Sequence, residues 1–175
     1  MSETSKARIL VVDDMPSIHD DFRKILGRSS SPESRRLDKL EEAFFDDAPS
    51  EDASPYANDS FELVHALQGE EATSLVEQSL QSGHPFSVAF IDMRMPPGWD
   101  GVETIRRVWA HDPELQIVIC TAFSDHNWFS ITQELRRTDK LIVLKKPFEN
   151  VEVLQLACAL SEKWRLAQAA GLRLE

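Results

Sequence analysis

The segment Ala7-Arg8-Ile9-Leu10-Val11-Val12-Asp13-Asp14 is the most informative one for the architecture of this chain. A short aliphatic run that ends in two acids is typical of a strand buried on both faces, with polar side chains at its carboxyl end. Apolar residues then recur at helical spacing over 16–26, and Gly27 follows where a helix would end. The sequence therefore opens with a buried strand and a helix.

The same alternation continues along the rest of the chain. Strands are expected at 61–66, 86–91, 115–120 and 141–144, and helices at 69–81, 101–110, 125–137 and 150–170. Asp100 and Ser124 are the expected N-caps of the helices that follow them, and Glu103 occupies the reciprocal position of a capping box. Because parallel strands need crossover connections, five strands alternating with five helices predict an α/β fold: a doubly wound parallel sheet in a three-layer sandwich.

Residues 28–60 interrupt this pattern, because they are acidic and rich in Ser and Pro. We interpret them as an insertion between the first helix and the second strand. Within it, 36–45 predicts a short amphipathic helix, whose apolar residues are Leu37, Leu40, Ala43 and Phe44. Two interpretations stay open: a surface loop, since added loop length costs little closure entropy, or a docking or dimerisation element that uses this apolar face and Phe45.

Composition narrows the class of protein. The length of 175 residues, with 42% hydrophobic and 28% charged residues, is typical of one globular domain. A formal net charge of -11 argues against direct binding to nucleic acid or to anionic membranes. The apolar run at 7–12 is too short for a signal peptide, and no window approaches the roughly 20 apolar residues of a membrane helix, so we expect neither. Cys120 and Cys158 lie in apolar runs, which is typical of buried thiols in a reducing compartment, so we expect a cytoplasmic protein.

Polar side chains follow four of the five predicted strands. In a parallel sheet the carboxyl ends of the strands form the edge at which sites lie, so we expect these side chains to meet there. They are Asp13 and Asp14 after the first strand, Asp92 after the third, Thr121 after the fourth and Lys146 after the fifth. Three neighbouring carboxylates repel one another unless a cation neutralises them, and hard oxygen ligands suit Mg²⁺. A carboxylate can also act as a nucleophile toward phosphorus, with an ammonium and a hydroxyl stabilising the phosphoryl oxygens.

Together these segments resemble the receiver domain of two-component response regulators. The motifs that carry the resemblance are Ile9-Leu10-Val11-Val12-Asp13-Asp14, Ile91-Asp92-Met93-Arg94-Met95-Pro96, Thr121-Ala122 and Lys146-Pro147-Phe148. The resemblance implies a flavodoxin-like (βα)5 fold with strand order 2-1-3-4-5. Residues 7–160 would form the receiver domain, and 161–175 a C-terminal helical extension that could link to an output module.

The resemblance also implies a function. A phosphoryl group would pass from the phosphohistidine of a sensor histidine kinase, or from a phosphotransfer protein, to Asp92 with Mg²⁺ as cofactor. The other implied roles are metal ligation by Asp13, Asp14, Asp92 and the backbone carbonyl of Arg94, and catalytic contacts of Lys146 and Thr121. We expect a regulatory protein whose only chemistry is its own phosphorylation and dephosphorylation. Its partners would include an output domain, or a second copy bound through the fourth helix, fifth strand and fifth helix or through the C-terminal helix.

Several features depart from the family pattern. Val143 stands three positions before Lys146, where an aromatic switch residue is frequent, and the turn around Trp99 is one residue longer than usual. Trp99 is therefore either a contact residue or a packed loop residue. Val143 and the long insertion at 28–60 keep one alternative open, a pseudo-receiver that is not phosphorylated and acts as a scaffold. A haloacid-dehalogenase-type phosphatase is disfavoured, because it needs an Asp-x-Asp pattern where this chain has Asp13-Asp14-Met15.

Overall fold

The computed structural model describes residues 6–27, 61–122 and 128–173. Within these ranges, strands and helices alternate as the sequence predicts. They are β1 (Ala7–Val12), α1 (Pro16–Leu26), β2 (Phe61–Ala66), α3 (Gly69–Gln81), β3 (Val88–Asp92), α4 (Gly101–His111), β4 (Gln116–Thr121), α5 (Trp128–Leu135), β5 (Leu141–Lys145) and α6 (Asn150–Arg173). The expected helix at 36–45 and the expected cap at Ser124 lie outside the described residues.

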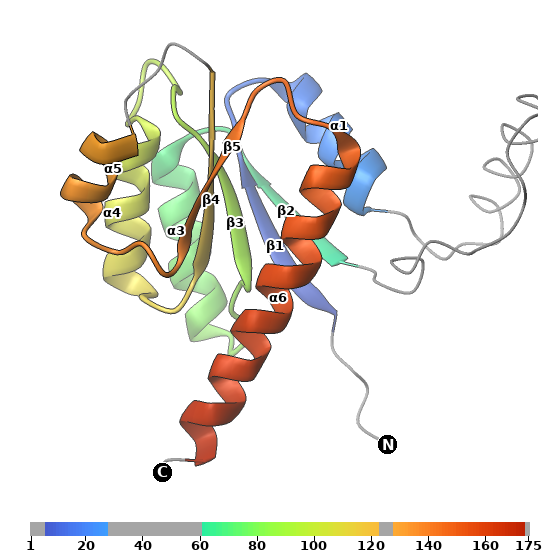
Figure 1. The fold of residues 1–175 in the computed structure, drawn as a ribbon, viewed down its shortest axis with the longest axis vertical. Coiled ribbons are helices and arrows are strands. Elements are labelled where there is room, and N and C mark those ends of the chain that lie inside the picture. Colours follow the sequence, from blue (N-terminus) through green and yellow to red (C-terminus); the bar gives the residue numbers. More distant parts are fainter. Residues whose placement is uncertain (1–5, 28–60, 123–127, 174–175) are drawn as a thin grey trace, which may run out of the picture.

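The five strands form one parallel sheet in the order β2-β1-β3-β4-β5, which confirms the predicted topology. β1, β3 and β4 occupy the centre, and β2 forms the edge next to β1 (Figure 1). The register pairs Val12 with Ile91, and Asp92 with Cys120. The residues that end β1 and β3 therefore lie beside each other at the carboxyl edge of the sheet.

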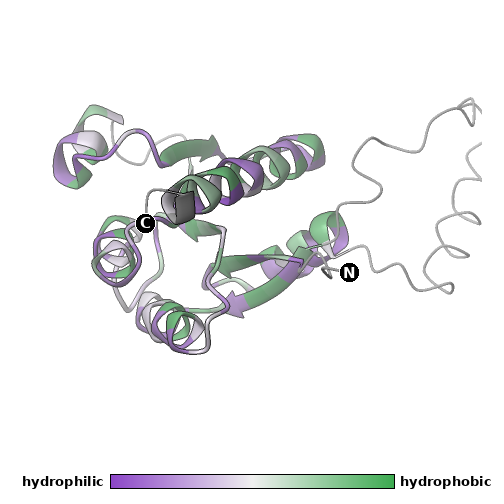
Figure 2. Ribbon diagram, turned by 90° about the horizontal axis from the view of Figure 1, so that it is seen from below, coloured by the Kyte–Doolittle hydropathy of each residue, from purple (hydrophilic) through white to green (hydrophobic). Residues whose placement is uncertain are grey.

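Alternate residues of the strands enter two separate apolar layers. Ile9 and Val11 face the layer that contains residues of α1 and α6, whereas Leu10 and Val12 face the layer that contains residues of α3, α4 and α5. Because successive side chains of a strand point to opposite faces, a strand covered on both faces must be apolar throughout. Figure 2 shows the strands mainly in green, between helices that carry both apolar and polar residues.

Several element boundaries differ from those predicted. β4 covers Gln116–Thr121 rather than 115–120, β5 ends at Lys145 rather than at residue 144, and α4 ends at His111 rather than at residue 110. β3 begins at Val88 rather than at residue 86, and it includes Asp92. α5 ends at Leu135 rather than at residue 137, because Arg136 adopts a left-handed conformation with φ 55° that does not continue a helix. α6 continues to Arg173, three residues beyond the predicted end at 170.

Of the two hydrogen bonds predicted for the capping box of α4, the structure contains the one accepted by Asp100. The Asp100 side chain accepts a hydrogen bond from the backbone N–H of Glu103 at 2.8 Å, as expected of an N-cap. The Glu103 carboxylate does not close the box, because its two oxygens contact Arg106 and Arg107. The Glu103 carboxylate thus binds arginines one turn further along the helix instead of the N-terminus of α4.

Helix α6 runs from the carboxyl edge of the sheet down one face and continues beyond the opposite edge (Figure 1). Ser161 is buried, and its hydroxyl lies 3.0 Å from the hydroxyl of Ser87, the residue that precedes β3. The predicted boundary at residues 160 and 161 therefore falls inside one unbroken helix. Across the described ranges, no helix has the length and apolar character that a membrane span requires.

Candidate functional site

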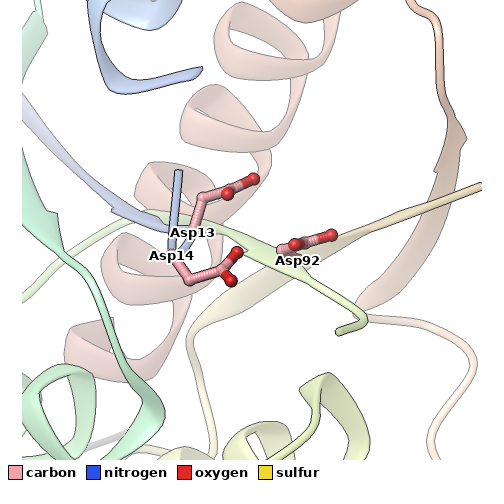
Figure 3. Close-up of side chains that lie close together, drawn as sticks. All are labelled: Asp13, Asp14 and Asp92. Carbon is pink, nitrogen blue, oxygen red and sulfur yellow. The ribbon is translucent and has the colours of Figure 1, made fainter. Parts of the chain in front are cut away.

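Three carboxylates meet at the carboxyl edge of the sheet, as the strand ends predicted. One oxygen from each of Asp13, Asp14 and Asp92 lies within 4.8 Å of the others. Figure 3 shows Asp13 and Asp14 in the segment after β1, with Asp92 at the end of β3. The cluster follows from topology, because β1 and β3 are hydrogen-bonded neighbours and Val12, the last residue of β1, pairs with Ile91, which directly precedes Asp92.

Asp13 is held by hydrogen bonds on several sides. Its backbone N–H donates to the carbonyl of Ala66 at 3.1 Å, which continues the β1–β2 ladder by one residue. Its Oδ1 accepts the backbone N–H of Met15 at 2.9 Å, and its Oδ2 accepts from Lys146 Nζ at 3.2 Å. Both carboxylate oxygens of this buried acid are thus engaged by the protein.

Lys146 connects two of the acids. Its Nζ lies 3.2 Å from Asp13 Oδ2 and 3.0 Å from Asp92 Oδ1, while its backbone N–H donates to the carbonyl of Thr121 at 2.8 Å. The backbone contact continues the β4–β5 ladder beyond Lys145 and thereby places the lysine over the end of the sheet. The ammonium thus joins the strand ends of β1, β3 and β5 in one charged group.

The electrostatics of this group are unbalanced. Burial raises the pKa of Asp92, and the charges of Asp13 and Asp14 raise it further against the opposing effect of Lys146. Burial by itself would lower the pKa of Lys146, but its hydrogen bonds and charge interactions with Asp13 and Asp92 outweigh burial and raise it. Three carboxylates face one ammonium, so the site fits a divalent cation with oxygen ligands such as Mg²⁺.

The other two predicted site residues lie near this group. Thr121 is buried at the end of β4, and its hydroxyl donates to the carbonyl of Ala122 at 3.0 Å. Arg94 is exposed in the turn between two buried residues, Met93 and Met95. The roles of the Thr121 hydroxyl and of the Arg94 carbonyl stay predictions.

Sequence reasoning did not single out Gly101 as a site residue, yet it touches the backbone that carries Asp92. A Cβ at Gly101 would lie 2.6 Å from the carbonyl oxygen of Asp92 and 2.9 Å from Cα of Met93. The Gly101 N–H also donates to the carbonyl of Met93 at 2.7 Å. The first residue of α4 therefore packs directly on the end of β3, which only a glycine permits.

We expect Gly101→Ala to lower the free energy of unfolding by about 2 kcal/mol, because a methyl group would press on backbone atoms that cannot move aside cheaply. Gly171→Ala is the matched control, since nothing lies within 4 Å of a Cβ at that position in α6. It should stabilise the protein by about 0.5 kcal/mol through higher helix propensity. Urea denaturation of both variants measures the difference, and equal effects would contradict the close packing at Gly101.

Two of the departures from the family pattern take up ordinary packing positions. Trp99 is half-buried, and the guanidinium of Arg107 lies 5.0 Å from its ring centroid. Its ring also lies against Gly69 at the start of α3, so the structure favours a packed loop residue over an exposed contact. Val143 is partly buried and packs against the apolar layer on the side of α3, α4 and α5.

The cysteines are thiols without a disulfide among the described residues. Cys120 is buried as predicted, whereas Cys158 is only half-buried. Cys120 is the register partner of Asp92 on β4, and burial raises the pKa of its thiol to about 12. The thiol next to the acidic group is therefore protonated and chemically quiet at neutral pH.

The sequence did not indicate that two histidines, His19 and His65, lie beside Asp13. His19 Nε2 lies 2.7 Å from the carbonyl oxygen of Asp13, and His19 Nδ1 lies 2.8 Å from Nδ1 of His65 on β2. Burial and the charge of Arg23 lower the pKa of His65 to about 4. The spacing of His19, Phe22 and Leu26 could have indicated that His19 is buried, because these three residues form the buried face of α1.

Comparison with protein families gives one match. Residues 57–157 match the model of the response regulator receiver domain. The match covers more than half of the chain and includes Asp92, Thr121 and Lys146, whereas Asp13 and Asp14 precede it. No curated protein matches this sequence.

Several solved structures share the fold. The crystal structure titled as an adenylate cyclase from Rhodopirellula baltica is 22% identical, with 97% of each chain covered and a TM-score of 0.66. A CheY-like receiver domain protein from Methanospirillum hungatei JF-1 is 18% identical over 93% of this chain and 99% of its own, with a TM-score of 0.62. A receiver protein from Sinorhizobium medicae WSM419 is 19% identical over 91% and 98%, with a TM-score of 0.59. These likenesses establish the flavodoxin-like architecture.

Proposed function

The chain belongs to the receiver domains of two-component response regulators, and from this premise we propose that it accepts a phosphoryl group on Asp92 from a phosphohistidine. Asp13, Asp14 and Asp92 would hold Mg²⁺, with the Arg94 carbonyl as a further ligand. The observation that carries the proposal is the position of Lys146 Nζ, 3.2 Å from Asp13 and 3.0 Å from Asp92. An ammonium at that position can neutralise negative charge on a group bound to Asp92.

Among the three acids, Asp92 is the best placed nucleophile. Both oxygens of Asp13 accept hydrogen bonds, and its side chain is 3% exposed. The Asp92 side chain is 12% exposed, and its Oδ2 accepts no hydrogen bond from the residues that the structure describes. An oxygen of Asp92 is thus available to attack phosphorus, whereas Asp13 would have to break contacts first.

The chemistry assigns one role to each residue. An Asp92 oxygen forms a bond to phosphorus while the phosphorus–nitrogen bond of the donor breaks and its electron pair returns to the imidazole. Bound Mg²⁺ would supply positive charge that neutralises the carboxylates and the phosphoryl oxygens. Lys146 contributes a second positive charge, and the Thr121 hydroxyl donates a hydrogen bond after turning away from the Ala122 carbonyl.

We further propose that this protein is a regulatory switch rather than a metabolic enzyme. Its kinase would approach the carboxyl edge of the sheet, and its output would respond at the surface of α5, β5 and α6. Trp128 and Phe129 support that assignment, since these large apolar side chains on α5 are 41% and 72% exposed. Residues 161–175 would extend α6 from the receiver domain of 7–160 toward an output module or a second copy.

Intact-mass analysis tests the proposed chemistry. Incubation with acetyl phosphate or phosphoramidate and Mg²⁺ should add one phosphoryl group to the wild-type chain, and excess EDTA should prevent the gain. The small donors bypass the unidentified kinase, so the result depends on this chain alone. A chain that gains no mass with any donor would instead be a pseudo-receiver, and its function would be that of a scaffold.

A further inference from the structure

A buried imidazole contacts the peptide that joins two of the acids. His19 is 2% exposed on the inner face of α1, and its Nε2 lies 2.7 Å from the carbonyl oxygen of Asp13. That carbonyl belongs to the peptide bond between Asp13 and Asp14. Because a carbonyl oxygen only accepts hydrogen bonds, His19 Nε2 must carry the proton and act as the donor.

The second nitrogen of His19 is held as well. When the His19 ring carries only this proton, its Nδ1 offers a lone pair, and His65 Nδ1 donates across the 2.8 Å separation. The two rings also make an edge contact, with centroids 4.9 Å apart and planes at 74°. A directed chain of hydrogen bonds therefore runs from His65 on the edge strand β2 through His19 to Asp13.

The peptide that His19 contacts controls how the two acids are arranged. A peptide unit is planar, so a hydrogen bond to its oxygen also orients its N–H and restricts the rotation of Asp13 and Asp14 on either side of it. The Asp13 N–H is already held by the Ala66 carbonyl at 3.1 Å. His19 donates the hydrogen bond to the Asp13 carbonyl, and its removal would leave that buried carbonyl without this donor.

We propose that His19 is a positioning residue for the acidic cluster: held by His65, it fixes the peptide between Asp13 and Asp14 and thereby sets the affinity for Mg²⁺. This inference rests on the proposed function, since it concerns the same metal site. Outer residues that orient metal ligands typically change metal affinity by about 10-fold to 100-fold when they are removed. His19 acts through a backbone carbonyl, so we expect an effect near the lower limit of that range.

Calorimetric titration with Mg²⁺ tests the proposal without relying on phosphorylation. His19→Leu should weaken Mg²⁺ binding about tenfold, while His19→Gln should restore much of the affinity because its amide can donate to the same carbonyl. His84→Leu is the matched control, since His84 is exposed in the loop after α3, and its affinity should equal that of the wild type. Urea denaturation of each variant, without metal, measures stability separately.

A structural role alone predicts a different result. If His19 only fills space in the core, His19→Leu would change the denaturation midpoint and leave the Mg²⁺ affinity of the folded protein unchanged, which would overturn the proposal. Should His19→Leu fail to fold, His65→Leu replaces it, because that variant keeps the Nε2 donor but removes its anchor. His65→Leu should weaken Mg²⁺ binding in the same direction, by about threefold, and unchanged binding would overturn the proposal.

The imidazole ¹⁵N spectrum of the wild-type protein provides a second measurement. At neutral pH it should show His19 protonated on Nε2 and His65 protonated on Nδ1, and the reverse assignment would contradict the hydrogen-bond chain. Failure of the proposed function looks different, because the wild type itself would then bind no Mg²⁺ or gain no phosphoryl group. A wild type that does both, with His19→Leu folded and equal in affinity, would refute only the role of His19.

Discussion

Asp92→Asn should abolish phosphoryl incorporation from acetyl phosphate, with no mass gain under conditions that phosphorylate the wild type fully. The substitution keeps the size of the side chain but replaces the nucleophilic carboxylate by an amide. Asp14→Asn is the matched control, because it removes charge from the same cluster and leaves the proposed acceptor in place. It should slow incorporation and raise the Mg²⁺ concentration required, but still allow the full mass gain. Incorporation into Asp92→Asn would identify another acid as the acceptor.

The same substitution should stabilise the metal-free protein at pH 7. Burial and the charge of Asp13 raise the pKa of Asp92 in the folded state, so the folded protein binds this proton more tightly than the unfolded chain does. Stability due to this group is therefore present at acidic pH and is lost as the pH rises through the unfolded value and then the folded value. The gain in urea midpoint should be largest at neutral pH and should shrink on acidification, where the carboxyl and the amide are both uncharged. A lower midpoint at pH 7 would show that attraction to Lys146 outweighs burial and repulsion.

Lys146→Met should have the second largest effect. The Lys146 side chain is 23% exposed, and its ammonium contacts two acids, one of which is almost fully buried. Its removal therefore leaves Asp13 and Asp92 to repel each other without compensation. We expect the free energy of unfolding to fall by about 2 kcal/mol, less than for a fully buried pair because water still reaches the lysine. Phosphoryl transfer should slow about 100-fold, as when one charge-stabilising donor is lost from an active site.

Two comparisons separate the electrostatic role of Lys146 from a general loss of packing. Lys145→Met changes the neighbouring, exposed lysine. It should leave the free energy of unfolding and the rate of phosphoryl transfer nearly unchanged. In the Asp92→Asn background, Lys146→Met should lower the free energy of unfolding by less than it does in the wild type, because one of the two repelling charges is gone. Saturating Mg²⁺ should restore part of the lost stability by binding only the folded state. An equal loss of free energy of unfolding in both backgrounds would contradict an electrostatic role for Lys146.

The architecture and most of the acidic group could be predicted because they depend on patterns that are local in sequence. A strand buried on both faces is largely apolar, so the runs 9–12 and 117–120 are conspicuous, and parallel topology then brings their ends together. Asp13, Asp14 and Asp92 accordingly form one cluster. Boundaries that depend on backbone conformation at single residues were less predictable, as at Arg136, whose left-handed φ ends α5 early.

What the amino-acid sequence determined by itself is the order of elements, the parallel sheet and the residues at its carboxyl edge, since hydrophobic periodicity and strand-end chemistry are read along the chain. Only the tertiary structure decided which of those side chains touch. The bridge of Lys146 between Asp13 and Asp92 depends on the distance across three strands. The contact of His19 with the Asp13 carbonyl depends on how α1 packs against β1 and β2. Such contacts join residues far apart in sequence through side-chain directions and close packing, which no local pattern specifies.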